Sequence, residues 1–377
     1  MNETPSYRLS NLLVYFLKLG TLGFGGPVAL VGAMERDLVE MHHWITPEEY
    51  NQGLSLAQLA PGPLAAQLSI YMGYVHYGLT GATLTGLAFV LPSFLMVVGL
   101  GALYLHFGGI AMIQALFYGI GAAVIGIIAR SAHKLSQRTL GKDPASWGIF
   151  VVAAVVTALL EREMVYLFLA GGVVLSLVRT HPWKQASAGI MGVPFGFAVP
   201  SLATGQLGTM GLFFAKAGAF VFGSGLAIVP FLHSGVVKEH HWLTERQFLD
   251  AVAVAMITPG PVVITVGFIG YLVAGFPGAC VAALGTFLPC YLFTVIPAPY
   301  VKKHSNNPSV KAFVDGVTAA ATGAIAGAVI VLGRRAIMDL PTALIALLSL
   351  LLLWRYKKLP EPWVIAGSGA LGLIFHP

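Results

Sequence analysis

Long apolar stretches separated by short polar segments run along almost the whole chain. Residues 81–105 and 342–354 contain no charged side chain, and a helix needs about 20 apolar residues to cross a hydrocarbon core of about 30 Å. The apolar–polar alternation that marks membrane β-barrels is absent. The pattern therefore predicts an all-α polytopic membrane protein.

The composition excludes a soluble globule. Of 377 residues, 57% are hydrophobic and 10% are charged, and the mean hydropathy is +0.81, so polar residues are too few to cover a soluble domain. The net charge of +6 is interpreted as loop charge that sets topology, with membrane lipids and no nucleic acid as partners. The first apolar run contains Lys18 and is expected to remain as a span. Cys280 and Cys290 are interpreted as packing residues.

The chain contains an internal repeat that covers nearly all of it. At an offset of 198, FLKLGTLGFGG (16–26) matches FAKAGAFVFGS (214–224), HHWIT (42–46) matches HHWLT (240–244), and Pro-Gly-Pro at 61–63 matches that at 259–261. After a one-residue deletion, the offset of 197 pairs VLPSF (90–94) with FLPCY (287–291), Gly119 with Gly316 and Gly126 with Gly323. The sequence predicts repeats over 1–184 and 208–377, joined by a segment, 185–207, that can itself span the membrane.

The distribution of Lys and Arg predicts that the two repeats have inverted topology. The segments 130–143, 179–187, 301–311 and 355–358 hold 12 of the 21 basic residues, and only inversion places all four on the cytoplasmic side. Two alternatives satisfy this. Each Pro-Gly-Pro segment either crosses fully, which gives 13 spans with the linking segment, or re-enters as a hairpin, which gives ten. In both, the first span of each half covers about 9–34 or 208–232.

The Pro-Gly-Pro breaks predict an anion site made of backbone. Proline ends one half-helix near Ala60 and starts another at Pro63. The start of that second half-helix presents free amides, those of Gly62, Leu64 and Ala65, with the positive end of the helix dipole. The equivalent amides of the second half belong to Gly260, Val262 and Val263, and nearby polar side chains can complete an oxyanion shell. The alternative is a pair of kinked packing helices.

A second, glycine-rich break interrupts the first span of each half, in GFGGP (23–27) and FGSG (222–225). Lys18 and Lys216 precede these breaks at equivalent positions and can supply positive charge to an anion. The alternatives are close helix packing for the glycines and snorkelling to the interface for the lysines. Asp315 lies inside an apolar run. It is either a candidate for carrying a coupling proton or an ordinary residue at the start of a helix.

Other chemistry receives little support. Adjacent histidines in the two His-His-Trp motifs make a poor metal site, and Trp44 and Trp242 favour interfacial anchoring. No GxxxxGK[ST] loop occurs, so nothing suggests that ATP drives the process. We expect no metal, no cofactor, no catalytic residue and no enzymatic activity.

Taken together, FGGP and LAPGP in the first half, with WLTERQFLDA, TPGP and FIGY in the second, resemble the chromate ion transporter family in its long, two-repeat form. The resemblance implies a multi-pass bacterial inner-membrane (plasma-membrane) secondary transporter that exports chromate and can also handle sulfate. It implies coupling to an ion or proton gradient, with the coupling ion unknown, and it leaves a homodimer open. The sequence departs from the family at GSG (223–225), where three glycines are common, and Met256 stands where the first repeat has Gln58.

The predicted oxyanion site lies where the breaks of both halves face each other near the midplane. Its predicted members are Lys18, Gly25, Gly26, Gln58, Pro61, Gly62, Pro63, Gln67, Lys216, Gly223, Ser224, Gly225, Thr258, Pro259, Gly260, Pro261 and Thr265.

Overall fold

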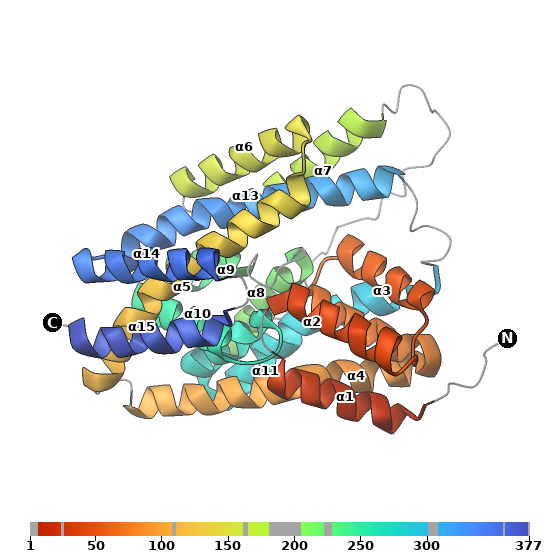
Figure 1. Ribbon diagram of the computed structural model, residues 1–377, viewed down its shortest axis with the longest axis horizontal. Coiled ribbons are helices and arrows are strands. Elements are labelled where there is room, and N and C mark those ends of the chain that lie inside the picture. Colours follow the sequence, from red (N-terminus) through yellow and green to blue (C-terminus); the bar gives the residue numbers. More distant parts are fainter. Residues whose placement is uncertain are drawn as a thin grey trace.

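The computed structural model describes residues 7–23, 26–107, 111–160, 165–180, 205–221, 228–300, 308–356 and 359–375. Every element in these ranges is helical (Figure 1). Residues 181–204, which include most of the predicted linking segment 185–207, lie outside them. The first repeat contains α1 (Leu9–Leu22), α2 (Gly26–Met34), the π-helix η1 (Glu35–Met41), α3 (Pro47–Leu59), α4 (Leu64–Phe107), α5 (Ala111–Leu140), α6 (Pro144–Leu160) and α7 (Val165–Thr180). The second contains α8 (Gln206–Phe220), α9 (Ile228–Leu232), η4 (His233–Glu239), α10 (Glu245–Ile257), η5 (Val262–Ile264), α11 (Thr265–Val295), η6 (Ala298–Tyr300), α13 (Pro308–Ala336), α14 (Leu340–Arg355) and α15 (Glu361–Phe375).

The first apolar segment of each repeat folds back on itself at its glycine-rich break. The Tyr15 hydroxyl donates to Asp37 at 3.4 Å, and the Tyr7 ring stacks on Trp44 with centroids 5.0 Å apart, so α1 and η1 run antiparallel. We call α1 with α2–η1 hairpin A, and α8 with α9–η4 hairpin A′, in which Phe213 stacks on Phe231. The sequence predicts first spans over 9–34 and 208–232 that are interrupted by these breaks; in the structure the segment after each break lies back against α1 or α8 and does not continue the crossing.

The Pro-Gly-Pro segment of the first repeat forms the tip of another hairpin. A capping box of Thr46 and Glu49, with proline at the first helical position, starts α3. Glu49 lies 3.2 Å from His76, which places the start of α3 beside residue 76 of α4. We call α3 with the first arm of α4 (residues 64–77) hairpin B. The Pro-Gly-Pro segment therefore has the geometry of a re-entrant hairpin and not that of a single full crossing.

The second repeat builds the equivalent hairpin B′ from α10, η5 and the first arm of α11 (residues 265–273). Thr244 and Gln247 form the matching capping box. Tyr104 contacts both arms of B′, because its hydroxyl donates to Asp250 and its ring packs on Phe268. The 13 residues of α10 extend about 20 Å, which is less than a bilayer core of about 30 Å.

Both long helices reverse direction after the hairpins. Gly78 in α4 has φ +57° and Gly275 in α11 has φ +62°, the left-handed region that favours glycine. The Thr85 hydroxyl reaches back to the Ser69 carbonyl at 3.0 Å, so the two arms of α4 lie side by side. The second arms, residues 79–107 and 276–295, are long enough to cross a membrane.

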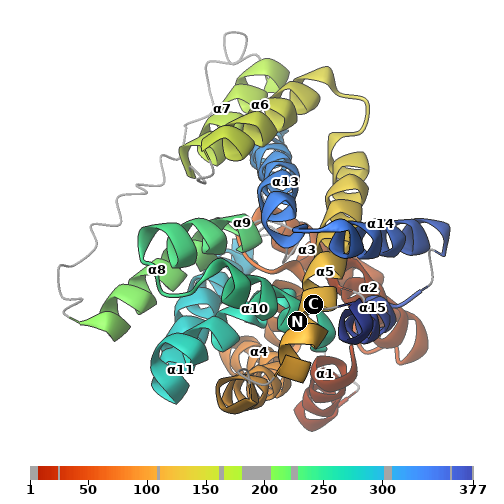
Figure 2. The ribbon, with the colours of Figure 1, turned by 90° about the vertical axis from the view of Figure 1, so that its left-hand side faces the viewer.

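The outer helices are exchanged between the repeats. Figure 2 shows α13 beside α5 and beneath the pair α6–α7, while α14 and α15 pack against α5. Glycines allow this close packing: a Cβ on Gly119 would collide with the Ser368 carbonyl of α15, and one on Gly316 with the Gly171 carbonyl of α7. The last two helices of each half therefore pack on the other half.

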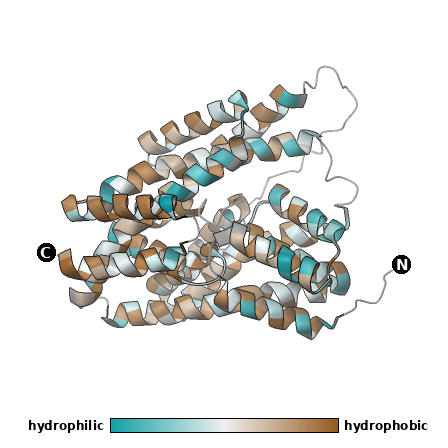
Figure 3. Ribbon diagram, viewed as in Figure 1, coloured by the Kyte–Doolittle hydropathy of each residue, from teal (hydrophilic) through white to brown (hydrophobic). Residues whose placement is uncertain are grey.

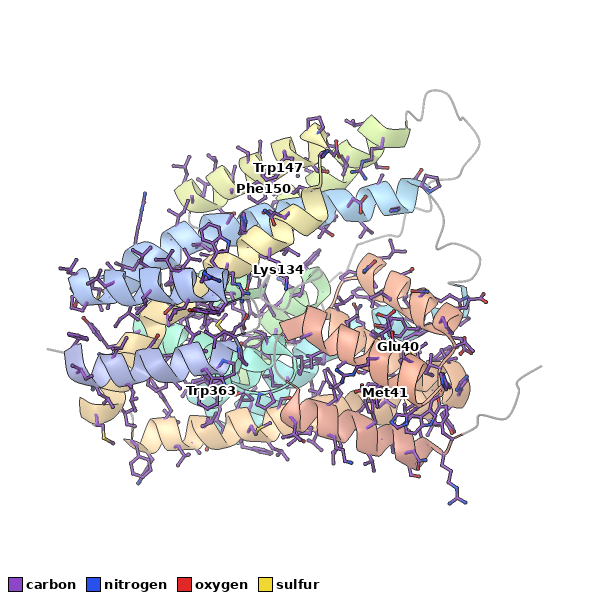
Figure 4. The ribbon with its side chains drawn as sticks, viewed as in Figure 1. Glu40, Met41, Lys134, Trp147, Phe150 and Trp363 are labelled. Carbon is purple, nitrogen blue, oxygen red and sulfur yellow. The ribbon has the colours of Figure 1, made fainter. Side chains whose placement is uncertain are left out.

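The described surface fits a lipid environment. Leu84, Leu87, Leu91 and Leu95 form an exposed stripe along α4, and Figure 3 shows apolar residues over most of α4, α14 and α15. The α5–α6 turn, the end of α7 and the start of α13 all lie towards the N-terminus in Figure 1, so the described parts of three of the four basic segments share a face. Exposed Trp147 and Trp363 follow two of these segments (Figure 4). We infer that this face is cytoplasmic.

The His-His-Trp motifs form the turns between hairpins A and B and between A′ and B′. His42 stacks on Trp44 and His240 on Trp242, with centroids 4.6 and 4.4 Å apart. The intervening His43 and His241 both have φ +52°. The motif recurs because it closes the same sharp turn in both halves.

Candidate functional site

The tips of hairpins B and A′ meet through the backbone. Helix α3 ends at Leu59 and α4 begins at Leu64, as the proline pattern predicts, and Gly62 between them has φ +142°. The Gly62 N–H donates to the Val221 carbonyl, at the end of α8, with an N···O distance of 2.5 Å. A bond thus joins the two repeats at the first Pro-Gly-Pro break.

The tips of hairpins B′ and A meet in the equivalent way. Gly260, with φ +97°, donates its N–H to the Gly23 carbonyl at 2.9 Å. Gly23 and Gly260 occupy the positions equivalent to Val221 and Gly62, so the two bonds are related by the repeat. The bases of A and B lie near the N-terminus while α8–α10 lie farther from it (Figure 1). The hairpins therefore enter from opposite faces and meet tip to tip, as inverted repeats require.

Two residues that the sequence analysis did not assign to the site line this junction. A Cβ on Gly62 would lie 3.1 Å from the Cys290 sulfur, and one on Gly260 would collide with the Ser93 hydroxyl. Ser93 and Cys290 follow the prolines Pro92 and Pro289 in the second arms of α4 and α11. The signal was present in the repeat, because VLPSF and FLPCY align there, but Cys290 was interpreted only as packing.

Gln67 is the polar side chain most directly aimed at the first tip. It is fully buried, and its amide nitrogen donates to the Pro61 carbonyl at 2.8 Å. This bond fixes the orientation of the side chain, and its other terminal atom, Oε1, is buried with no hydrogen-bond partner. A buried acceptor without a donor is costly, so this atom marks a place for a water or a ligand hydroxyl.

The amides predicted to bind the anion are only partly available. Those of Gly62 and Gly260 are bonded across the repeats. Leu64 and Ala65 begin α4, where an α-helix leaves its amides without intrahelical partners. In hairpin B′ the equivalent turn is a short 3₁₀ helix, in which the Ile264 N–H donates to the Pro261 carbonyl at 2.9 Å. The first half therefore offers the better helix N-terminus.

The remaining predicted residues fall into four groups. Thr258 and Thr265 are buried, and their hydroxyls donate to the carbonyls of Val254 and Val262 at 2.7 Å. Among the predicted residues, the side chains of Gln58, Lys18 and Lys216 are exposed. Gly26 begins α2, Pro63 precedes α4, and Pro259 is buried beside Gly260. Gly25, Gly223, Ser224 and Gly225 lie outside the described residues.

Asp315 lies far from the junction in an ion-pair cluster. Its carboxylate is 2.5 Å from Arg179, and Arg179 also contacts Asp143 at 2.7 Å. Hydrogen bonding from the guanidinium holds the pKa of Asp143, in the α5–α6 turn, below its usual range. The cluster joins α7 to α13 on the inferred cytoplasmic face. Asp315 therefore holds these helices together, in addition to being a candidate for coupling.

The contribution of this ion-pair cluster to stability can be tested. Arg179→Gln leaves two nearby carboxylates without their shared cation, so the variant should unfold at a slightly lower temperature, with a loss of about 1 kcal/mol because the pair is partly exposed. The measurement is a thermal melt of detergent-solubilised protein. Asp143 contributes this stability only while it is ionised, so the difference from the unsubstituted protein should disappear as the pH falls through the lowered pKa. An unchanged difference in acid would contradict the assignment.

Comparison with known proteins gives a consistent result over the whole length. The family model described as "Chromate transporter" matches residues 10–176 and again 208–373. A chromate transport protein of Cupriavidus metallidurans is 61% identical, with 100% of this chain and 96% of the relative covered. A probable chromate transport protein of Synechococcus elongatus is 60% identical, with 98% and 96% covered. A chromate transport protein of Pseudomonas aeruginosa is 32% identical, with 99% and 94% covered.

No solved structure matches the chain, so the hairpin arrangement has no experimental counterpart among the matches. The two family matches, one in each half, agree with a two-repeat protein. The apolar helices and the bacterial relatives identify a multi-pass protein of the plasma membrane. The chain belongs to the chromate transporter family.

Proposed function

We propose that this protein exports chromate across the plasma membrane as a secondary transporter, that sulfate is a second substrate, and that the oxyanion binds where the four hairpin tips meet. The observation that carries the proposal is the pair of equivalent backbone bonds, Gly62 to Val221 and Gly260 to Gly23. Each bond joins broken backbone of one repeat to broken backbone of the other. In inverted-repeat transporters such broken helices form the substrate site near the midplane.

The chemistry at the junction suits a tetrahedral oxyanion. The amides of Leu64 and Ala65 point along the positive end of the α4 dipole. The unpartnered oxygen of Gln67 accepts a hydrogen bond from a water or from the hydroxyl of a singly protonated oxyanion. When the tips separate, the Gly62 and Gly260 amides exchange their carbonyl partners for the anion. In this proposal, substrate binding and separation of the tips are the same event.

Lys18 and Lys216 supply positive charge in the proposal. Lys18 lies five residues before Gly23, about 7.5 Å along α1. A lysine on a lipid-exposed face costs at least about 2.5 kcal/mol on insertion scales. If the charge served no purpose, Lys18→Gln and Lys216→Gln would insert as well or better and transport normally. We expect each to lose at least tenfold in transport rate at unchanged expression, whereas normal chromate resistance in cells would remove the lysines from the mechanism.

Cys290 offers a natural reporter of the junction. It is fully buried, and Cys280 is the other cysteine of the chain. In a Cys280→Ser variant we expect Cys290 to react slowly with N-ethylmaleimide, and sulfate to change that rate at least threefold by binding beside it. Sulfate serves as the probe because chromate oxidises thiols. Nitrate at equal ionic strength is the control, and equal labelling rates in sulfate and nitrate would argue against a site beside Cys290.

Transport by purified protein in liposomes tests the function itself. Vesicles loaded with unlabelled sulfate should accumulate labelled sulfate transiently by counterflow, and external chromate should compete with the label. A channel would pass the anion without counterflow, and a membrane scaffold would pass none. Either result would refute the proposal.

A further inference from the structure

A second polar site lies away from the junction, in the described part of hairpin B′. Tyr104, Ile113, Gln114, Phe117, Arg246 and Asp250 line a cavity of about 170 Å³, which is large enough for water. Tyr104 lies near the end of α4, Gln114 near the start of α5, and Arg246 near the start of α10. All three helix ends lie on the face opposite the basic segments. On the topology inferred above, the cavity therefore lies on the outer side of the membrane.

Asp250 is the buried acid in the lining of this cavity. Its exposed fraction is 4%, and it is the one carboxylate among the buried side chains of the described residues. The Tyr104 hydroxyl donates to its Oδ2 atom at 2.6 Å. Across the described parts of the chain, Asp250 forms no ion pair within 4 Å. An ionised carboxylate in this setting lacks a compensating charge in contact, which favours its binding a proton when one arrives.

The charged neighbours on other elements are engaged elsewhere. Glu245, on the same helix, pairs with His233 of η4 at 2.7 Å and with Arg335 of α13. Glu361, the charged residue of α15, faces Arg130 and Lys134 of α5.

Closer to the cavity, Arg246 is exposed at its mouth and donates to the Gln114 carbonyl at 3.2 Å. Tyr104 is the titratable group that α4 contributes to the lining, the lining residues of α5 carry no charge, and α11 has no charged residue. Asp250 is thus the carboxyl that outside water reaches through this cavity.

We propose that Asp250 is the site where a coupling proton enters from the outer face and that its protonation is linked to movement of hairpin B′. This inference rests on the proposed function. Asp250 lies ten residues before Gly260, about 15 Å along α10 and its cap. The proton from outside water binds the Asp250 carboxylate and makes B′ electrically neutral there, and it leaves to the cytoplasm as an oxyanion moves out. The equivalent residue of hairpin B is Gln52, so one half alone carries this acid.

The test separates exchange of anions from their coupling to protons. Asp250→Asn keeps the size of the side chain and an acceptor for Tyr104. In liposomes we expect it to retain labelled-sulfate counterflow within threefold of the unsubstituted protein. Its stimulation by an imposed pH gradient should fall at least tenfold. Asp250→Glu should restore part of that stimulation.

Glu48→Gln is the matched control, because it converts a carboxylate to an amide at an exposed position of α3, in the equivalent hairpin. It should keep both counterflow and gradient stimulation. Tyr104→Phe removes the hydrogen bond that stabilises ionised Asp250, so the pH at which transport is half-maximal should rise. This variant tests the assignment independently if Asp250→Asn folds poorly.

Three results would overturn the inference: normal gradient stimulation in Asp250→Asn, loss of counterflow by a well-folded Asp250→Asn, or loss of stimulation in Asp315→Asn with Asp250→Asn unaffected. Absence of counterflow in the unsubstituted protein would refute the proposed function instead.

Discussion

Replacing Gly260 by alanine is expected to abolish transport, with at least a tenfold loss in oxyanion counterflow from liposomes. The residue has φ +97°, where an L-residue costs roughly 1–2 kcal/mol. A Cβ there would also collide with the Ser93 hydroxyl, and overpacking of this kind adds about 1–3 kcal/mol. Both effects act on the amide that bonds Gly23 and, in the proposal, later binds the anion.

Two companion variants separate the causes of this loss. Gly275→Ala places alanine at a similar left-handed position, φ +62°, with no atom within 4 Å of the added Cβ, so it reports backbone strain alone. Gly260→Ala combined with Ser93→Ala removes the colliding oxygen and should recover part of the activity. Gly62→Ala should behave like Gly260→Ala, because its Cβ would lie 2.7 Å from Gln67 Nε2. Unchanged anion affinity in both Gly62→Ala and Gly260→Ala would remove the backbone site from the mechanism.

Gly119→Ala is expected to cause the largest loss of stability, about 1–3 kcal/mol in the free energy of unfolding. The added Cβ would collide with the Ser368 carbonyl and lie 2.8 Å from the Gly372 backbone nitrogen. Backbone cannot rotate away as a side chain can, so α15 must move off α5. The repeat-equivalent Gly316→Ala should behave alike, because its Cβ would meet the Gly171 backbone of α7.

The measurement is the thermal unfolding of purified protein, followed by the amount that remains monodisperse in detergent. Gly121→Ala, two residues along the same helix, is the matched control, because no atom lies within 4 Å of its Cβ. Alanine there should be neutral or stabilise by up to about 1 kcal/mol. Equal melting of Gly119→Ala and Gly121→Ala would contradict the exchanged packing of the outer helices.

Several features were predictable because their causes are local in the sequence. The apolar stretches predicted membrane helices, and the repeated motifs predicted equivalent elements in both halves. Thr46 and Thr244 start α3 and α10 through matching capping boxes. Proline then ends α3 near Ala60, as its missing donor and ring require.

Other features were not predictable, because one sequence pattern fits two arrangements. The residues around Gly78 are compatible with a helix that continues and with one that reverses direction. Only the backbone angle of Gly78 in the folded protein shows that the helix reverses. Gln58 and Gln67 flank the same break, yet Gln58 is exposed and Gln67 is fully buried. Asp250 was part of a quoted motif, but its burial beside Tyr104 depends on a residue from the other repeat.

The sequence by itself determined that this is an α-helical membrane protein of two related halves, each broken twice, because hydropathy, proline and glycine act within a few residues. Only the tertiary structure decided what the breaks contact. The Gly62 amide bonds Val221 and the Gly260 amide bonds Gly23, which pairs each Pro-Gly-Pro break with the glycine-rich break of the opposite half. A backbone donor takes whichever acceptor the fold brings near, and these acceptors come from distant parts of the chain.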